Sequence, residues 1–234
     1  MNPPAIMEAT TPTANAQQSL GKLAVSIPGA TAIFRKLKLD FCCGGQQSLE
    51  NACTEKGLDA SQVLAQIRAL DHTESLPPTP SAPELIDHIL QRFHEVHRQQ
   101  LPELIRMARR VEAVHREHPH VPQGLADQLE TMQDELLEHM AKEETILFPL
   151  LKKGGHPMAE HPIGMMRHEH INHGAQLERL AVLTTQHTPP SGACNTWQAL
   201  YAGTARLTED LIEHIHLENN HLFPAFEIAS HSAH

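Results

Sequence analysis

The chain has 234 residues, with 40 % hydrophobic and 3 % aromatic side chains and a formal net charge of -10 at pH 7. Few aromatic residues and many helix formers favour an all-α protein over a sheet protein, and the negative charge argues against nucleic-acid binding. The sequence shows no apolar run of transmembrane length. Residues 1–15 lack the basic start and apolar core of a signal peptide, so we expect them to be a disordered tail of a cytoplasmic protein.

Residues 16–73 are predicted to form a small helical domain. Its expected helices are an amphipathic stretch over 28–39, a short helix over 48–56 and a helix over 60–70. A cluster of prolines follows these helices. Because proline interrupts helices and stiffens extended chain, we interpret residues 74–82 as a stiff linker.

Two adjacent cysteines, Cys42 and Cys43, are the first feature along the chain that points to chemistry. Two glycines follow them and allow a tight turn that exposes both thiols. Because neighbouring side chains diverge, both cannot easily hold one tetrahedral ion, so we expect redox or transfer chemistry; the alternative is a pair of small residues packed near a turn. Cys53 and Cys194 are expected to be ordinary packing residues. These four cysteines resemble no secreted disulfide framework, which favours the cytoplasm.

Residues 83–228 are predicted to form an up-down-up-down four-helix bundle. Short connections separate four long periodic stretches, and short connections make neighbouring helices antiparallel. The stretches cover 83–117, with Pro102 as a kink site, and then 122–153, 162–186 and 193–228. Residues 229–234 are expected to be a second tail.

One pattern occurs twice in the bundle: His-x3-Glu-x3-Leu-Phe-Pro begins at His139 and again at His214, 75 residues later. On a helix, a histidine and the glutamate four residues on share one face. The apolar stripe of the second helix runs through His139 and Glu143 to Ile146, and that of the fourth runs through His214 and Glu218. Two buried glutamates at matching depth are costly without a cation, so the repeat predicts a shared metal site.

Histidines also interrupt the stripes of the first and third helices, as the pairs His94/His97 and His170/His173. Each half of the bundle thus consists of a helix with inward histidines, a turn, and a helix with the His-x3-Glu pattern. This common order suggests an internal duplication that builds a two-metal centre. Periodicity does not choose one member of each pair, and the other can be an outer partner or a hydrogen-bonded core histidine. Other histidines are expected on solvated helix faces: His115, His118, His120, His231 and His234.

Taken together, these features resemble a known family. The bundle resembles the hemerythrin-like di-iron domain, and the module with Cys42 and Cys43 resembles the N-terminal domain of iron–sulfur cluster repair di-iron proteins, the repair of iron centres family. The resemblance covers roughly residues 18–228 and rests on phrases such as Cys-Cys-Gly-Gly, Gln-Leu-Pro-Glu-Leu-Ile and Lys-Glu-Glu-Thr-Ile-Leu-Phe-Pro. Carried over position by position, it selects six metal ligands: His94, His139, Glu143, His170, His214 and Glu218.

The resemblance implies two iron ions bridged by Glu143 and Glu218, with an oxo or hydroxo bridge between them. Octahedral metals with these ligands keep roughly one position each open for nitric oxide, dioxygen or peroxide. Mixed nitrogen and oxygen ligands fit iron or manganese better than structural zinc, and the resemblance selects iron. The extra histidines His168, His173, His216 and His221 depart from the family pattern. Because His216 and His221 lie off the inward stripe, we expect them at the surface.

The resemblance implies a protein that repairs iron–sulfur clusters damaged by nitrosative or oxidative stress, with iron delivery as the expected route. Its partners would be damaged iron–sulfur proteins or an assembly scaffold, and a homodimer is compatible with the sequence. A di-iron nitric oxide or peroxide reductase is the second hypothesis, because open metal positions serve it equally well. A carrier or sensor of dioxygen or nitric oxide is the third, although it would have no need of Cys42 and Cys43. Neither nucleic acid nor a membrane is an expected partner.

Overall fold

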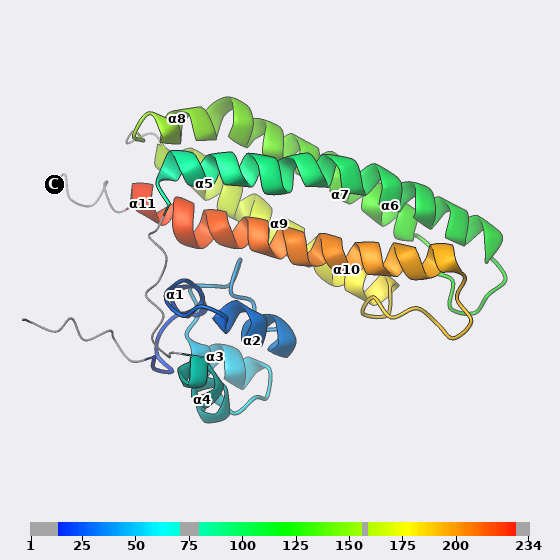
Figure 1. Cartoon of the computed structure of the whole chain (residues 1–234), viewed down its shortest axis with the longest axis horizontal. Coiled ribbons are helices and arrows are strands. Elements are labelled where there is room, and N and C mark those ends of the chain that lie inside the picture. Colours follow the sequence, from blue (N-terminus) through cyan, green and yellow to red (C-terminus); the bar gives the residue numbers. More distant parts are fainter. Residues whose placement is uncertain (1–13, 71–79, 156–158, 228–234) are drawn as a thin grey trace, which may run out of the picture. The chain divides into compact units, whose positions relative to one another are not determined.

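The computed structural model describes residues 14–70, 80–155 and 159–227 (Figure 1). Within these ranges no strand of a sheet occurs, and Ser19 and Ser48 form one isolated antiparallel bridge. The prediction of an all-α protein is therefore confirmed. The chain divides into two compact units, Met1–Pro77 and Pro78–His234. Most of the predicted tails and of the predicted linker lies outside the described residues.

Four short helices form the first unit: α1 (Leu20–Ser26), α2 (Ala30–Leu37), α3 (Leu49–Glu55) and α4 (Ala60–Leu70). The last three fall inside the predicted stretches. Helix α1 is a new finding, because its seven residues are too few to show a helical period in the sequence. The Ser19 hydroxyl caps α1 by accepting from the Lys22 N–H, and the helix buries Leu20 and Leu23.

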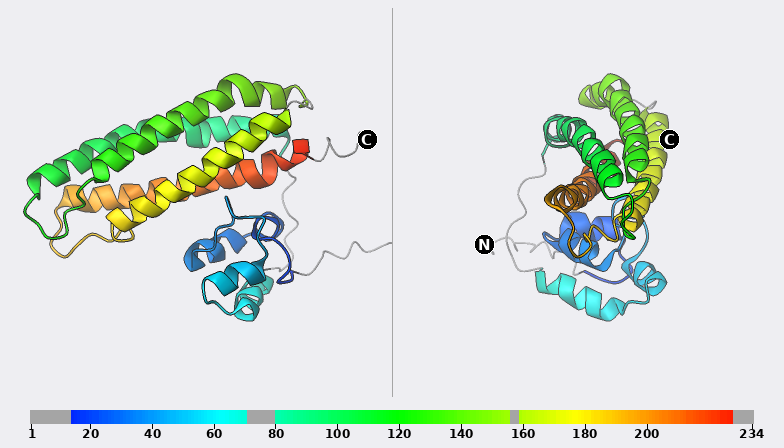
Figure 2. Two further views of the ribbon diagram at one scale, coloured as in Figure 1. Left: turned by 180° about the vertical axis from the view of Figure 1, so that it is seen from behind. Right: turned by 90° about the vertical axis from the view of Figure 1, so that its right-hand side faces the viewer.

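The second unit is the predicted four-helix bundle, and Figures 1 and 2 show its four long rods side by side. The first rod is α5 (Ala82–Ile89), η1 (Leu90–His94) and α6 (Glu95–Val114); the second is α7 (Leu125–Lys142), η2 (Glu143–Leu147) and α8 (Phe148–Lys152); the third is α9 (Glu160–Leu183); the fourth is α10 (Asn195–His216), η4 (Leu217–Leu222) and α11 (Pro224–Glu227). Helix α6 packs against α7 and α10, and α7 packs against α9. Helix α6 continues through Pro102.

Three of the four rods contain a π-helical turn, labelled η1, η2 and η4. In η2 the Phe148 N–H donates to the Glu143 carbonyl, and in η4 the Phe223 N–H donates to the Glu218 carbonyl at 2.8 Å. A π turn holds one more residue than an α turn, so the side chains that follow it point in a new direction. The sequence did not reveal these turns, because a helical period does not show one extra residue within a turn.

After the turn η2, the residues of the second rod that face the core lie one position later in the sequence than a regular α-helix would place them. The side chain of Leu147 is 1 % exposed, whereas that of Ile146 is 59 % exposed. The sequence stripe placed Ile146 in the core, and that placement is wrong because it assumed a regular α-helical period after Glu143. The extra residue of the π turn turns Ile146 outward and Leu147 inward.

This register predicts opposite outcomes for two neighbouring alanine substitutions. Leu147→Ala should lower the free energy of unfolding of the metal-free protein by about 3 kcal/mol, because it empties a buried site. Ile146→Ala should change it by less than about 0.5 kcal/mol, because the side chain is mostly in water. Urea denaturation of both variants measures this difference. Equal losses, or a larger loss for Ile146→Ala, would contradict the π register.

The second half of the repeated sequence pattern packs at one end of the bundle and supports the histidines. Leu147, Phe148, Leu222 and Phe223 belong to one buried cluster with residues of the first and third rods. Three aromatic rings also stack on imidazoles, with ring centroids 5.4 to 6.0 Å apart: Phe148 on His94, Phe223 on His170 and Phe93 on His214. The Leu-Phe-Pro part of the pattern therefore packs one end of the bundle, and its Phe148 and Phe223 rings support His94 and His170 on the first and third rods.

Candidate metal centre

The six residues that the family resemblance selects are all buried, with side chains no more than 2 % exposed. They come from all four rods: His94 ends η1, His139 lies in α7, Glu143 begins η2, His170 lies in α9, His214 lies in α10 and Glu218 lies in η4. All three π turns thus contain one of these residues. Single π turns within α-helices are frequent at functional sites, where they change the direction of side chains.

These side chains form two groups of four that share both glutamates. The His94/His214 group consists of His94, Glu143, His214 and Glu218, and the His139/His170 group consists of His139, Glu143, His170 and Glu218. Within each group, one nitrogen or oxygen atom per residue lies within 4.8 Å of all the others. This is the geometry in which one ion can contact all four side chains.

Each glutamate turns one oxygen toward each group. Glu143 places Oε2 3.3 Å from Nε2 of His94 and Oε1 3.4 Å from Nε2 of His139. Glu218 repeats the arrangement, with each of its oxygens 3.1 Å from the Nε2 atom of one remaining histidine. The two carboxylates therefore lie between the groups, where they could contact an ion on either side.

Two of the histidines are oriented by a carboxylate behind them. His94 Nδ1 lies 2.7 Å from Glu144 Oε1, and His139 Nδ1 lies 2.8 Å from Glu169 Oε2. Each carboxylate also accepts from a cationic side chain, which keeps it charged. An ionised carboxylate only accepts hydrogen bonds, so Nδ1 carries the proton in both rings. In the neutral ring, Nε2 then presents its lone pair to the centre, as a metal ligand does.

The other two histidines differ from each other. His170 Nδ1 lies 2.9 Å from the amide oxygen Oδ1 of Asn219, which fixes the ring in the same way. His214 Nδ1 is buried and has no hydrogen-bond partner among the described residues. Three of the four imidazoles therefore have a hydrogen-bond partner at Nδ1, and that of His214 has none among the described residues.

The arrangement fits a pair of cations better than it fits the protein alone. His94 and His214 bring their Nε2 atoms to 3.2 Å, and so do His139 and His170. Two lone pairs at that distance repel unless a proton or a cation lies between them. Both oxygens of Glu143 are also buried without a hydrogen bond from a described residue. Buried carboxylates without donors cost several kcal/mol, and a bound cation removes that cost.

The charges of these groups lead to the same conclusion. Burial raises the pKa of Glu218, but the neighbouring His214 and His170 outweigh it and hold the pKa well below the usual value. Burial lowers the pKa of His139, but the Glu143 carboxylate and the hydrogen bond to Glu169 raise it to about 10. The buried carboxylates thus stay ionised, and in the metal-free protein protons on imidazoles balance them. A divalent cation would replace those protons.

His97 and His173, the alternatives that periodicity left open, lie beside the groups and belong to neither. Both are buried, at 0 % and 2 % exposure. Burial lowers the pKa of His97 to about 2 and that of His173 to about 3, so both rings are neutral. His97 packs beside the ring of His214 at 5.5 Å, and His173 packs edge-on against His139 at 5.0 Å.

The expectation that His216 and His221 lie at the surface is wrong for His216. Its side chain is only 2 % exposed. His216 Nδ1 lies 2.9 Å from the amide nitrogen of Asn220, and its ring packs edge-on against His221 at 5.1 Å. His214, Ile215 and His216 are all buried, so the end of α10 is covered on more sides than the single inward stripe that the sequence predicted.

Sequence reasoning missed the partners that orient the histidines: Glu144, Glu169 and Asn219. A signal for two of them exists, because Glu144 follows Glu143 and Asn219 follows Glu218 directly in the sequence. A residue next to an inward ligand borders the site on a neighbouring face of the helix. Glu169 lies directly before His170 and serves the ring of a different rod, which a single helical stripe does not reveal.

In the first unit, Asp40 closes the turn that holds the two adjacent cysteines. Its carboxylate accepts from the backbone N–H groups of Cys42, Cys43 and Gly44 at 2.9 to 3.1 Å. A Cβ on Gly44 would lie 3.1 Å from the Asp40 carboxylate, so this tight turn favours glycine. The Sγ atoms of the cysteines lie 3.6 Å apart, and with a carboxylate oxygen of Asp40 they form a further group that could hold an ion.

The expectation that both thiols are exposed is wrong for Cys42, which is 8 % exposed, while Cys43 is half-buried. A hydrogen bond with Cys43, burial and the charge of Asp40 raise the pKa of Cys42 well above its usual value, so its sulfur is a thiol at neutral pH. The expectation for the other cysteines holds for Cys53, which is buried, and is wrong for Cys194, which is exposed. Cys194 precedes α10 and lies outside its packed face.

The fold and the site together define a class: a four-helix bundle with two buried His/Glu groups is a cation-binding bundle of the hemerythrin type. Residues 85–226 match the family model of the hemerythrin HHE cation binding domain, and residues 16–71 match ScdA_N, a domain of unknown function. No described helix is long and apolar enough to span a membrane.

Curated relatives cover both units. The iron-sulfur cluster repair protein YtfE of Dickeya chrysanthemi is 51 % identical over 210 residues, which are 88 % of this chain and 95 % of the relative. The YtfE proteins of Musicola paradisiaca and Yersinia pseudotuberculosis are each 50 % identical, over 89 % and 88 % of this chain and 95 % of each relative. The chain belongs to this family, the YtfE iron–sulfur cluster repair proteins.

Proposed function

We propose that this protein repairs iron–sulfur clusters damaged by nitrosative or oxidative stress, and that it delivers iron held in the bundle to the damaged cluster. The observation that carries the proposal is the pair of buried groups that share Glu143 and Glu218. Six side chains divided between two positions give each ion fewer protein ligands of its own than a closed structural site gives. Such a site suits an ion that has to leave.

The proposal places one iron in each group, with Glu143 and Glu218 as bridges. Bound iron would supply Lewis-acid and one-electron chemistry. The chain supplies the environment: neutral Nε2 atoms aimed inward, ionised carboxylates between them, and buried aromatic rings such as Phe148 and Phe223 that cover the imidazoles. Cys42 and Cys43 are proposed to assist in redox or transfer steps, and the recipients are damaged iron–sulfur proteins or an assembly scaffold in the cytoplasm.

We further propose that iron leaves from the His94/His214 group. A partner behind a ligating histidine fixes its ring and raises its basicity, and losing such a partner typically weakens metal binding by about 10- to 100-fold. Both histidines of the His139/His170 group have such a partner, whereas His214 has none among the described residues. The first group should therefore bind iron more weakly.

This inequality predicts a two-phase loss of iron to a chelator in the native protein. Glu169→Ala removes the partner of His139 and should bring the slow phase to within about 10-fold of the fast phase. Glu138→Ala is the matched control. Glu138 and Glu169 both form an ion pair with Lys142, but of these two glutamates only Glu169 contacts His139. Stopped-flow chelation followed by iron absorbance measures both phases. A single phase in the native protein, or an equal effect of the two variants, would contradict the assignment.

The repair itself is tested with a cluster enzyme that nitric oxide has inactivated. The iron-loaded protein should restore its activity faster than the same concentration of ferrous salt, and the metal-free protein should have no effect. A Cys42→Ser, Cys43→Ser double variant should keep its iron and restore activity more slowly. If the ferrous salt succeeds and the iron-loaded protein fails, delivery by this protein is excluded.

A nitric oxide or peroxide reductase is the second candidate, and His97 and His173 favour it. Both are neutral, and His97 Nδ1, His97 Nε2 and His173 Nε2 are buried with no hydrogen-bond partner among the described residues. A neutral imidazole carries one N–H, which could donate to a small molecule bound beside His214 or His139. Anaerobic turnover of the reduced, iron-loaded protein with nitric oxide decides, because a reductase forms nitrous oxide above the level of free iron.

A further inference from the structure

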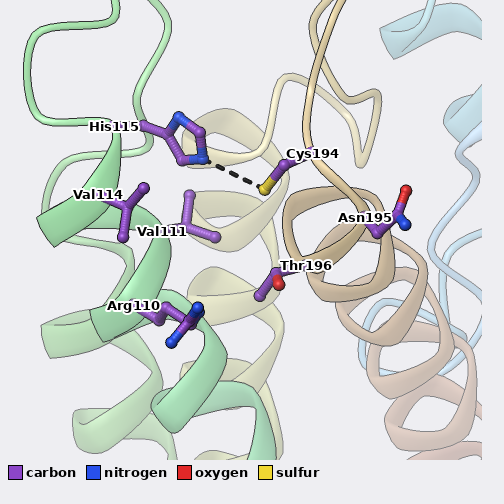
Figure 3. A pocket seen from close by; sticks show the side chains of 7 residues that line it. All are labelled: Arg110, Val111, Val114, His115, Cys194, Asn195 and Thr196. Carbon is purple, nitrogen blue, oxygen red and sulfur yellow. Dashed lines mark hydrogen bonds between the residues drawn. The ribbon is translucent and has the colours of Figure 1, made fainter.

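A second site lies at the end of the bundle far from the candidate metal centre. It is formed where α6 ends and α10 begins (Figure 3). His214 lies 20 positions after Cys194, the residue just before α10, which corresponds to roughly 30 Å along the helix axis. The chemistry of this end is therefore independent of the six residues discussed above.

A thiol and an imidazole meet at this end. His115 Nε2 lies 3.2 Å from Cys194 Sγ, a contact drawn in Figure 3. His115 was expected on a solvated helix face, but its ring is half-buried and packs 5.1 Å from the buried ring of Trp197. A nucleophile within hydrogen-bond reach of a base, with the base held by a third group, is the arrangement that activates thiols.

Cys194 lies at the start of a long helix, where backbone N–H groups can interact with its sulfur. Cys194 is the N-cap residue of α10, a helix of 22 residues, and its side chain makes no capping hydrogen bond. The N–H groups of a first helical turn have no partner within the helix and attract negative charge. The thiol is exposed, so a reagent can reach it.

The thiol opens into a cleft with room for a small organic molecule. The cleft has a volume of about 380 Å³ and is lined by Arg110, Val111, Val114, His115, Asn195 and Thr196 together with Cys194. Arg110 is exposed and forms no ion pair within the described residues. Arginine binds carboxylates well, because its planar donors match their two oxygens. The valines supply an apolar wall for an aliphatic chain.

We propose that Cys194 is a site of reversible S-thiolation by small, carboxylate-bearing disulfides, with His115 as its base and Arg110 as the carboxylate receptor. The Cys194 proton passes to His115 Nε2, and the thiolate attacks one sulfur of the disulfide. A bond forms between Cys194 Sγ and that sulfur while the disulfide's own S–S bond breaks. The leaving thiolate takes the proton from His115. Cys194 is oxidised, one half of the disulfide is reduced to a thiol, and a second thiol reverses the exchange.

The test is the rate of mixed-disulfide formation on the full-length protein, followed by mass spectrometry with peptide mapping. Glutathione disulfide, which carries carboxylates, is compared with the neutral bis(2-hydroxyethyl) disulfide. Cys194 should react with glutathione disulfide at least ~10-fold faster than Cys43 and Cys53 in the same molecule, because it is exposed, has an imidazole 3.2 Å away and opens into a cleft. Peptide mapping separates the cysteines, so no second mutation is needed.

Two variants separate the roles of the base and of the receptor. His115→Phe keeps a ring against Trp197 and should slow both disulfides at least ~10-fold. Arg110→Gln should slow the reaction of Cys194 with glutathione disulfide and leave its rate with the neutral disulfide unchanged. Cys194→Ser should abolish the adduct, and an unchanged melting temperature shows that each variant is folded. The proposal is overturned if Cys194 reacts no faster than Cys43, or if both variants react with glutathione disulfide as the native protein does.

Discussion

With the proposed two-iron centre, replacing Glu143 with alanine should remove both metal ions, not one. Glu143 Oε1 and Oε2 face different groups, at 3.4 Å from His139 Nε2 and 3.3 Å from His94 Nε2. Removing the carboxylate therefore takes one ligand from each position and one of the two negative charges that balance the cations. We expect the affinity of each position to fall by more than ~100-fold, since loss of a mere outer partner already costs up to that much.

The iron content of the desalted variant measures this effect. Glu138→Ala is the control, because Glu138 lies on the same rod and is largely exposed. His170→Ala removes a ligand from one group only and should leave the other position occupied. If Glu143→Ala keeps its full iron content, or loses only as much as His170→Ala, the shared role of this carboxylate is refuted.

Removing the metal from the native protein should lower its melting temperature by roughly 8 to 16 °C. A ligand present at about 1,000 times its dissociation constant stabilises the folded state by about 4 kcal/mol, and each kcal/mol is worth about 2–4 °C for a chain of this size. Burial lowers the pKa of His139, but the neighbouring carboxylates outweigh it and raise the pKa to about 10, so protons partly compensate for the missing cations. We therefore expect the metal-free bundle to stay folded.

The single tryptophan of the chain, Trp197, reports on this change selectively. It is 1 % exposed and lies in α10, so its fluorescence follows the unfolding of the bundle and not that of the first unit. The melting temperature should fall on chelation and return when ferrous iron is added back. An equal melting temperature with and without metal would mean that the bundle does not couple its stability to the groups around Glu143 and Glu218.

Periodicity predicted the bundle and four of the six candidate residues, and family resemblance chose His94 and His170 from the two histidine pairs that periodicity left open. His139 and His214 interrupt apolar stripes at matching places, and burial of Glu143 and Glu218 at 0 % exposure agrees with those stripes. The choice of His94 over His97 came from family resemblance, since both histidines are buried and periodicity treats them alike.

Other features of the structure depend on local geometry that the helical period of the sequence does not reveal. The π turns change the register after Glu143, which is why Ile146 is exposed and Leu147 is buried. The partner of His139 is Glu169, and contacts between rods follow from packing and not from spacing within one helix. The meeting of His115 with Cys194 joins the end of one helix to the start of another, 79 residues later.

The most direct test of the central claim is a crystal structure of the iron-loaded protein with anomalous diffraction at the iron absorption edge. Two anomalous peaks are expected in the bundle. One should lie within bonding distance of the Nε2 atoms of His94 and His214, and the other within bonding distance of the Nε2 atoms of His139 and His170. The carboxylates of Glu143 and Glu218 should lie between the two peaks. A single peak, or peaks away from these side chains, would contradict a two-iron centre built on shared glutamates.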